Sequence, residues 1–529
     1  APRRALGHLT APGFSTYNGS GNPALPCKVI YVALPPDADE SSVCVQPGSY
    51  SMAPIPGEFD ISPVPAATTA SGVEDWGRGK QISAGHNQLV YRKNAFYPEE
   101  HVRVRCVGHL RTWKIAEVEF WPYCYNPVTG RLRAVTSGKA ALSFAKNAGA
   151  SAAVSDPVAA RMVGFVSNAT EAASFYPPVL GDQLASVADY VIITTSAIAA
   201  QSTKLSAFAA FQAGRGFTAR IVTETDRGGQ VGDVGAVAAN KIRSWLQTNY
   251  LTLGIKYVLL IGNPDPSNGD VPMKMLWPGH NPDPHGTSSA YPDAASDYWY
   301  ADLTGNWDLN GNGYAAEESA NGVDGDFGVN GVDQIPEVYV GRIPYYGSIP
   351  DLNHILQKTM DYESQVLGSW SRTFLLPMKP LAIDPSPMLS YQLGEEIKRD
   401  VITPCNLIAD RIYDGVYDPL YPPAAPEHIP CNPSAVQTEW QRGVGLVFWM
   451  AHGSARSADG VFSSDMCPSL DDTKPAIVYA ASCDNGWPED SNNLGYALLR
   501  RGAVSTQTAS RVSWYYSDYY PDGIHDNLY

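Results

Sequence analysis

Several sequence features that identify common classes of protein are absent from this chain of 529 residues. No apolar run reaches 18 residues, which argues against a membrane-spanning helix. Only 17% of the residues are charged, and a net charge of −16 argues against nucleic acid as a partner. No Cys-x-x-Cys pair occurs, so a zinc site of that kind is not expected. The chain also begins without the apolar stretch of a signal peptide.

What the chain does contain is typical of a large globular protein. Hydrophobic residues make up 44%, and 47 Gly with 42 Pro indicate many turns and much β structure. The length predicts two to four domains of roughly 100–200 residues each. The 8 cysteines form one early and one late group, which favours disulfides within separate domains and an oxidising compartment. We therefore expect a secreted or cell-surface protein whose signal peptide has been removed.

The N-terminal region, residues 1–146, is predicted to be all β. Residues 102–107 and 113–120 alternate apolar and polar side chains, as half-buried strands do, and residues 28–34 are a further strand candidate. The sequence Asn-Pro-Val-Thr-Gly at 126–130 predicts a turn between two such runs. We interpret this region as a β-sandwich, followed by an Ala-, Ser- and Pro-rich linker at 147–189.

From residue 190 onward, apolar strands alternate with amphipathic helices. Near-continuous apolar strands separated by helices predict a mainly parallel sheet covered by helices, an α/β domain spanning 190–529. We divide it into a first half at 190–370 and a second half at 371–529. Ligand sites in such sheets lie beyond the carboxyl ends of the strands.

A long loop at 291–336 contains DLNGNG, which matches the start of a calcium-binding loop. Carboxylate and amide oxygens at alternate positions suit this hard cation, so Asp308, Asn310 and Asn312 are candidate structural Ca²⁺ ligands. The twelfth position is Ser319 rather than Glu, so the loop is not an EF-hand. The alternative is a solvated polar turn.

Two predicted strands end at reactive side chains. The run 446–449 leads to His452 and the run 476–480 leads to Cys483, and each is followed by a glycine turn. If the strands are parallel neighbours, both side chains emerge at one edge of the sheet. An imidazole there can take the thiol proton and later protonate a leaving amine. The N–H of Gly453 is a candidate oxyanion donor. Taken singly, each residue is more often structural, but the pair favours a catalytic dyad.

These strand ends resemble the gingipain family of cysteine peptidases, within the caspase-like superfamily. The resemblance rests on AHGS at 451–454 and ASCDNG at 481–486, with the flanking segments SDYWY at 296–300 and PEVYVGRIP at 336–344. YVLLIGN at 257–263 is similar as well, although the family usually has Asp where Asn263 stands. The first domain resembles the family's β-sandwich prodomain through GHLR at 108–111 and YNP at 125–127.

The resemblance implies a caspase-like peptidase domain in which His452 is the base, Cys483 the nucleophile and Gly453 an oxyanion donor. It implies no cofactor for catalysis. Asp384 occupies the place of the residue that orients the histidine, although loop lengths differ, and Trp514 resembles the aromatic wall of the pocket for the substrate's P1 side chain. The family's catalytic domain usually continues past the point where this chain stops, so we expect a truncated C-terminus.

Two functions follow as hypotheses. The first is a secreted cysteine endopeptidase that hydrolyses proteins or peptides and is made as a zymogen, with its own prodomain as inhibitor and a cleavage point at Arg161. The second is a silent or latent peptidase-fold protein that self-assembles as a cell-surface or filament subunit. The P1 preference stays open, with Glu395 and Glu396 as possible pocket residues or solvated helix residues.

Overall fold

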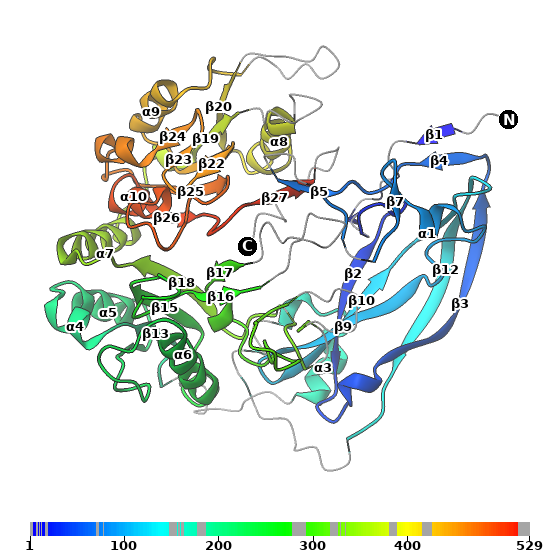
Figure 1. The fold of residues 1–529 in the computed structure, drawn as a ribbon, viewed down its shortest axis with the longest axis horizontal. Coiled ribbons are helices and arrows are strands. Elements are labelled where there is room, and N and C mark those ends of the chain that lie inside the picture. The colour runs from blue at the N-terminus through cyan, green and yellow to red at the C-terminus, as the bar shows by residue number, and fades with distance from the viewer. Residues whose placement is uncertain are drawn as a thin grey trace.

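The computed structural model shows the N-terminal region beside a larger region of helices and strands (Figure 1). It describes residues 4–516 except 7–8, 10, 12, 16–18, 70–73, 78, 148–155, 157–158, 160–162, 177–186, 278–292, 318–325, 328–329, 334, 380–388 and 415–425. Among the described residues, no helix is long and apolar enough to cross a membrane.

The N-terminal region is built on two antiparallel three-stranded sheets, in the orders β2-β10-β9 and β11-β12-β3. Their strands are β2 (Lys28–Leu34), β3 (Cys44–Ile55), β9 (Val102–Leu110), β10 (Trp113–Phe120), β11 (Tyr123–Asn126) and β12 (Arg131–Ser143). The amide oxygen of Asn126 accepts hydrogen bonds from the N–H groups of Val128 and Thr129, both at 3.1 Å, which forms the predicted turn between β11 and β12. The predicted β-sandwich is confirmed.

The sandwich is held together by apolar side chains that face inward from its strands. Leu34, Val107, Ala116 and Val118 form one buried cluster. Full burial of a Val or Leu side chain contributes about 1.5–3 kcal/mol. Alternate residues of β9 and β10 therefore supply the inward face, while Trp113 and Ile115 on the other face of β10 lie in a second buried cluster with Ala172 and Tyr176.

Part of the segment predicted as a linker is helical and packs on the sandwich. Helix α3 (Ala169–Phe175) follows Asn168, whose side-chain amide bonds both the N–H and the carbonyl of Ala33 in β2, each at 2.9 Å. The ring of Tyr176 stacks on Trp113 with centroids 4.3 Å apart. Residues 166–176 therefore lie against the N-terminal domain.

The first half of the α/β domain contains a four-stranded parallel sheet in the order β14-β13-β15-β18. Its elements are β13 (Tyr190–Ile193), α4 (Ser196–Gln201), α5 (Leu205–Gly214), β14 (Ala219–Val222), α6 (Gly235–Asn249), β15 (Tyr257–Gly262), β18 (Tyr339–Pro344) and α7 (Ile349–Ser364). The strands are apolar because helices cover the sheet, as the sequence pattern predicted.

The second half contains a five-stranded parallel sheet in the order β20-β19-β21-β25-β26. Its elements are β19 (Thr373–Met378), α8 (Leu389–Ile397), β20 (Ile408–Tyr413), α9 (Pro433–Gln441), β21 (Leu446–Met450), β25 (Ala476–Ala481), α10 (Leu494–Arg500) and β26 (Ala503–Gln507). The predicted fold class, a β-sandwich followed by a mainly parallel α/β domain, is confirmed.

Short elements complete the described chain. They are β1 (Arg4–Leu6), β4 (Phe59–Ile61), β5 (Ala67–Thr69), β6 (Glu74–Asp75), β7 (Ile82–Ser83), β8 (His86–Asn87), α1 (Gln88–Tyr91), β16 (Lys274–Leu276), β17 (Ala294–Ser296), β22 (Gly453–Ser454), β23 (Ser457–Ala458), β24 (Phe462–Ser463) and β27 (Trp514–Tyr516). One of them joins the two domains, because β27 pairs with β5 of the N-terminal domain. Figure 1 shows β27, in red, reaching toward the blue β5.

Candidate active site

His452 and Cys483 lie at the same edge of the second sheet. Strands β21 and β25 are parallel neighbours, and Met450 pairs with Ala481 in their register. Each candidate residue follows the last residue of its strand by two positions. Beyond the strands, the N–H of Ala451 donates to the carbonyl of Ala481 at 3.2 Å. The backbone therefore presents both side chains from adjacent positions, as parallel strands require.

The Cys483 thiol is buried, with the residue only 8% exposed. Burial raises the pKa of Cys483 to about 11, and the nearby Asp484 carboxylate acts in the same direction. The N–H of Ser513 donates to the sulfur at 3.4 Å, which opposes the rise. Because the thiolate is the nucleophile, only on the order of one thiol in ten thousand is ionised at neutral pH in this form.

Gly453 brings the histidine loop against the nucleophile. A Cβ on Gly453 would lie 2.3 Å from the carbonyl oxygen of Cys483 and 2.7 Å from its nitrogen. A side chain at this position would therefore push the two loops apart. The His452 carbonyl accepts a hydrogen bond from the N–H of Asp459 at 2.8 Å. Among the hydrogen bonds of the described residues, none joins the His452 ring to the Cys483 sulfur, a contact that often tightens only when substrate binds.

A buried polar network fixes the turn that carries the nucleophile. The indole N–H of Trp449 donates to the Ser482 hydroxyl at 2.9 Å, and that hydroxyl donates to the Asn485 amide oxygen. The Asn485 amide nitrogen donates to the carbonyls of Ser454 and Ser457 at 2.7 and 3.0 Å. Asn485 thus ties the cysteine turn to the histidine loop. The motif ASCDNG contains this residue, but no pattern in the sequence indicates its role.

Asp484, directly after the nucleophile, has a left-handed backbone with φ of 61°. Burial raises the pKa of its carboxyl to about 6, and the Arg511 guanidinium opposes that rise. Its Oδ1 is buried, and no hydrogen bond to it is formed within the described part of the chain. A carboxyl group that is partly shielded from solvent therefore lies beside the thiol.

A strand of the N-terminal domain pairs with the residues beside the nucleophile. Trp514, Tyr515 and Tyr516 of β27 lie opposite residues 69, 68 and 67 of β5 in antiparallel register. The residue before β27 is Ser513, which contacts the Cys483 sulfur. Trp514, the expected wall of the P1 pocket, is buried, with 3% exposure, at the start of this strand. The N-terminal domain therefore reaches the immediate surroundings of the candidate nucleophile.

A second contact between the domains is centred on a buried arginine. Arg111, at the tip of the β9–β10 hairpin, is 2% exposed. Its guanidinium donates from Nε to Asp156 at 2.7 Å, from Nη1 to the carbonyls of Ile255 and Glu337 at 2.8 and 2.9 Å, and from Nη2 to the carbonyl of Tyr250 at 3.1 Å. A buried guanidinium held by several acceptors is geometrically specific.

Buried carboxyl groups flank this contact. The side chain of Asp333 accepts a hydrogen bond from the N–H of His109 at 2.6 Å. A Cβ on Gly108 would lie 2.6 Å from the Asp333 side chain, so the hairpin packs directly on it. Burial, together with the neighbouring Asp302, raises the pKa of Asp333 to about 7. The two domains thus share a closely packed polar interface.

The candidate calcium ligands lie together in the predicted loop. Asp308 accepts from the N–H of Gly313 at 3.1 Å through Oδ2, while its Oδ1 is buried without a hydrogen bond among the described residues. The side-chain oxygens of Asn310 and Asn312 accept backbone N–H groups two residues further on, at 3.0 and 2.9 Å. Both amides also donate to Glu317. Calcium binding stays a prediction, which the orphaned Oδ1 supports.

Other predicted residues are placed differently or not at all. Asp384 and the cleavage point Arg161 lie outside the described residues. Glu395 accepts a hydrogen bond from the guanidinium of Arg411, which is 2% exposed, and another from the hydroxyl of Tyr413 at 2.8 Å. Glu395 is therefore paired with a buried arginine rather than freely solvated on its helix, and its role in a pocket stays a prediction.

The predicted disulfides are not formed: all eight cysteines are free thiols in the structure. Cys27 belongs to one apolar cluster, in the N-terminal domain, and Cys431 and Cys467 share another, in the second half of the α/β domain. These cysteines act as small buried hydrophobes. Cys44 and Cys405 are exposed, so the two groups are only partly core residues, and the oxidising compartment stays a prediction.

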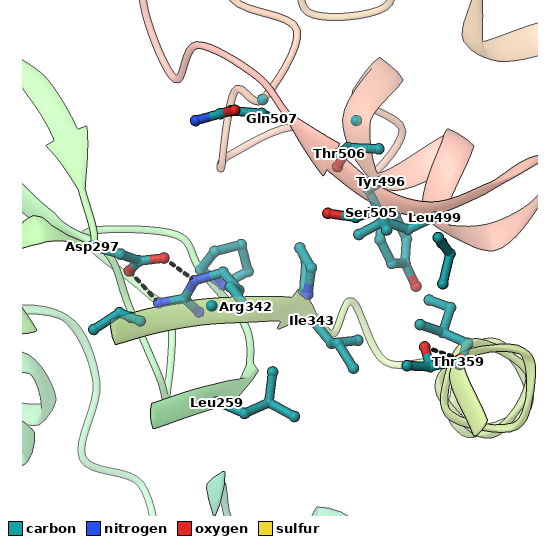
Figure 2. A pocket seen from close by; sticks show the side chains of 18 of the residues that line it. Leu259, Asp297, Arg342, Ile343, Thr359, Tyr496, Leu499, Ser505, Thr506 and Gln507 are labelled. Carbon is teal, nitrogen blue, oxygen red and sulfur yellow. Dashed lines mark hydrogen bonds and ion pairs between the residues drawn. The ribbon is translucent and has the colours of Figure 1, made fainter. Parts of the chain in front are cut away.

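A cavity of about 760 Å³ lies between the two halves of the α/β domain. Figure 2 shows Arg342 and Ile343 of β18 on one side and Ser505, Thr506 and Gln507 of β26 on the other. Its lining includes neither His452 nor Cys483. The cavity is therefore separate from the candidate dyad.

Comparison with known families assigns both parts of the chain. The model of peptidase family C25 matches residues 183–529, and that of the C25 propeptide matches residues 2–162. The chain belongs to peptidase family C25. The family's peptidase region contains the α/β domain with His452 and Cys483, and its propeptide contains the β-sandwich with Arg111. Helix α3 falls between the two matched regions. No curated protein matches the chain.

Solved C25 structures are only distantly similar. The chain is 17% identical to the Arg-specific cysteine proteinase gingipain R, with 63% of this chain and 65% of that chain covered at a TM-score of 0.43. A complex of Porphyromonas gingivalis RgpB pro- and mature domains gives 17% identity, coverage of 61% and 64%, and the same TM-score of 0.43. The match thus spans a little under two thirds of the length of these structures.

Proposed function

We propose that this protein is a cysteine endopeptidase, with Cys483 as nucleophile and His452 as general base, made in a latent form. The observation that carries the proposal is the register of β21 and β25, which sets both residues two positions beyond paired strand ends. The membership of family C25 supports it. No metal or cofactor is needed for this chemistry.

The proposed reaction follows the usual two steps. His452 takes the proton from the Cys483 thiol, and the thiolate attacks the substrate's carbonyl carbon. The N–H of Gly453 stabilises the oxyanion, and protonated His452 gives its proton to the leaving amine. Water, deprotonated by the same imidazole, then hydrolyses the thioester and restores the thiol. Asn485 maintains the relative position of the two loops during both steps.

Latency is the second part of the proposal. Three observations support it: β5 pairs beside the nucleophile, the Cys483 thiol is buried with a raised pKa, and Arg111 anchors the N-terminal domain on the first half. A domain held at these two separate places keeps substrate away from Cys483 and His452 while the linker is intact. Cleavage of the linker and release of the domain would expose the thiol.

The alternative is a peptidase-fold subunit without turnover. The buried thiol and the missing hydrogen bond between Cys483 and His452 favour it specifically, since a silent protein needs neither an exposed nor an activated cysteine. Secretion, surface assembly and self-association stay predictions. The two functions differ in whether turnover appears once the N-terminal domain is removed.

The test follows hydrolysis of casein and of a mixed peptide library before and after limited proteolysis of the linker. Wild-type protein is expected to gain turnover after the cut, and Cys483→Ala and His452→Ala to lose it by several orders of magnitude. Cys405→Ala is the matched control, because that thiol is exposed and precedes the start of β20 rather than following the end of a strand. A Cys483→Ala protein with wild-type turnover, or a wild-type protein silent after domain removal, would contradict the proposal.

A further inference from the structure

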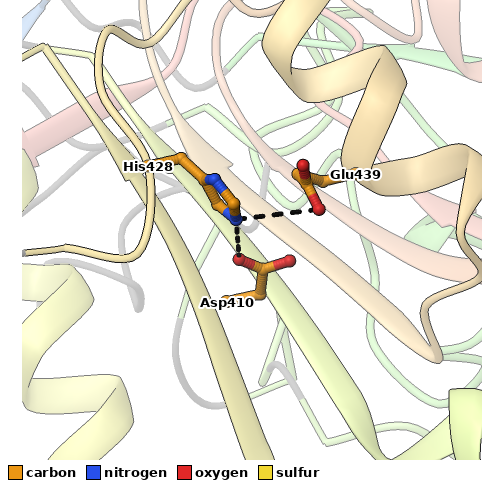
Figure 3. A group of neighbouring side chains, drawn as sticks. All are labelled: Asp410, His428 and Glu439. Atoms are coloured by element: carbon orange, nitrogen blue, oxygen red, sulfur yellow. Dashed lines mark ion pairs between the residues drawn. The ribbon is translucent and has the colours of Figure 1, made fainter.

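Three side chains from separate elements converge beyond the outer edge of the second sheet (Figure 3). Asp410 belongs to β20, Glu439 to α9, and His428 lies on the segment that forms an isolated bridge with Ile412. The His428 Nε2 lies 2.9 Å from Asp410 Oδ1 and 3.6 Å from Glu439 Oε2. All three potential ligand atoms lie within 4.8 Å of one another.

The closest of these contacts is not a hydrogen bond. Asp410 Oδ1 is buried, and it accepts no hydrogen bond within the described part of the chain, although the His428 Nε2 is 2.9 Å away. The two atoms are close but misaligned for donation by one to the other. Such an arrangement is expected when lone pairs are directed at a common point between them. An orphaned buried carboxylate oxygen otherwise costs stability.

The net charge around these three side chains favours a bound cation. The carboxylate of Glu439 is paired with the Arg442 guanidinium, and the carboxylate of Glu427 is paired with the Arg411 guanidinium. With a neutral imidazole, Asp410 and Glu439 carry two negative charges against the single positive charge of Arg442. One negative charge of this group is therefore left without a cationic partner among the described side chains.

We propose that Asp410, His428 and Glu439 bind one divalent transition-metal ion of the zinc class. One imidazole and two carboxylates are a common ligand set for such ions. Bonds of roughly 2.1 Å in a tetrahedron separate ligand atoms by about 3.4 Å, close to the two separations found here. The partial exposure of His428, at 32% of its side chain, leaves a side open for water as a further ligand.

The site is structural rather than catalytic. It lies on β20, at the opposite edge of the sheet from β26 and separated from β21 by β19. A bound ion would tie β20 to α9 and fix the chain where it returns to the sheet at His428. Because the ion would bind only the folded form, it would raise the melting temperature.

The experiment titrates the full chain with zinc by calorimetry and follows its melting curve, in a Cys483→Ala background that removes the catalytic thiol. The parent is expected to bind one more zinc ion than the His428→Ala variant, or to bind it roughly 100-fold more tightly. His354→Ala is the matched control, because this histidine pairs with Asp472 at 2.6 Å but belongs to no such three-residue group among the described residues. Asp410→Asn, which preserves side-chain size, replaces His428→Ala if that variant does not fold.

Arg442→Gln separates a metal site from a plain ion-pair cluster. Its guanidinium competes for the Glu439 oxygen, so its removal is expected to lower the melting temperature without metal and to preserve or strengthen zinc binding. The proposal is overturned if the parent, His428→Ala and Asp410→Asn proteins give the same zinc isotherm. It is also overturned if zinc fails to raise the melting temperature of Arg442→Gln.

Discussion

Arg111 of the propeptide is joined to Glu337 of the peptidase region twice. Its backbone N–H donates to Glu337 Oε1 at 3.2 Å, and its Nη1 donates to the Glu337 carbonyl at 2.9 Å. Both residues are buried, so no water can replace these bonds. This contact lies on the first half of the domain, whereas Cys483 lies on the second. One of the two described contacts of the propeptide therefore lies away from the candidate nucleophile, whereas the pairing of β5 with β27 lies beside it.

The Arg111→Ala variant is expected to release the propeptide once the linker is cut. Removal of one partner of a buried, multiply bonded charge costs about 3–5 kcal/mol, which corresponds to a loss of roughly 150- to 5000-fold in propeptide affinity. Gel filtration after limited proteolysis measures whether the two parts still elute together. Turnover of the released peptidase should equal that of wild type.

Arg133→Ala is the matched control for this prediction. Arg133 is also in the propeptide, but it is exposed and only stacks on Phe96, with 4.0 Å between its guanidinium carbon and the ring centroid. Its removal should leave the nicked complex intact. Co-elution of both parts in the Arg111→Ala protein at micromolar concentration would show that the anchor is dispensable.

Thr68→Pro is expected to weaken latency without changing the mature peptidase. Residue 68 lies in the middle of β5 and pairs with residues of both β27 and β6. Proline removes its N–H and distorts the strand, so basal turnover of the uncut chain should rise roughly tenfold or more. Thr68→Val, which suits a strand, should stay latent. Equal basal turnover of the two variants would show that the β5–β27 pairing does not restrain the enzyme.

The strands with clear patterns could be predicted from the sequence. Residues 28–34 and 113–120 were predicted at the bounds that the structure gives β2 and β10, because a sandwich strand needs one apolar face. Strand β20 was missed. It is an edge strand whose central residues are Asp410 and Arg411, so it lacks the apolar run on which the prediction depended.

The candidate site was predictable only in part, for a related reason. Positions 452 and 483 follow apolar strands directly, and that local signal placed them together. The role of Arg111 has no local signal, because its partner Glu337 is 226 positions away. The propeptide strand at 67–69 is too short to show an alternation of apolar and polar residues. Its pairing beside the nucleophile could therefore be found only from the structure.

Calcium is expected to stabilise the loop that contains Asp308. Its buried Oδ1 lacks a hydrogen bond among the described residues, and a hard cation would satisfy it. Millimolar Ca²⁺ should raise the melting temperature relative to a chelator, and Asp308→Ala should abolish that difference. Asp265→Ala is the control, since its carboxylate already accepts from the N–H of Ser267 at 2.8 Å in a similar turn. Identical melting curves with and without Ca²⁺ would show that the loop is a polar turn that does not bind calcium.

The pH dependence of alkylation reports on the burial of Cys483. Burial raises the pKa of this thiol from 9.0 to about 11, so the intact chain should react with iodoacetamide very slowly at pH 7. Because only the thiolate reacts, the rate should rise roughly tenfold per pH unit and level off only near pH 11.

The raised pKa of Cys483 also determines how this thiol changes the stability of the fold with pH. The folded protein keeps the Cys483 proton to a higher pH than the unfolded chain, so this contribution to stability is complete below pH 9.0 and is lost as pH rises toward about 11. Removal of the propeptide should expose the thiol, lower its pKa and increase the labelling rate at pH 8 by at least roughly tenfold. Peptide mapping by mass spectrometry separates Cys483 from the exposed Cys405. If Cys483 is labelled at the same rate before and after propeptide removal, the propeptide does not shield the nucleophile.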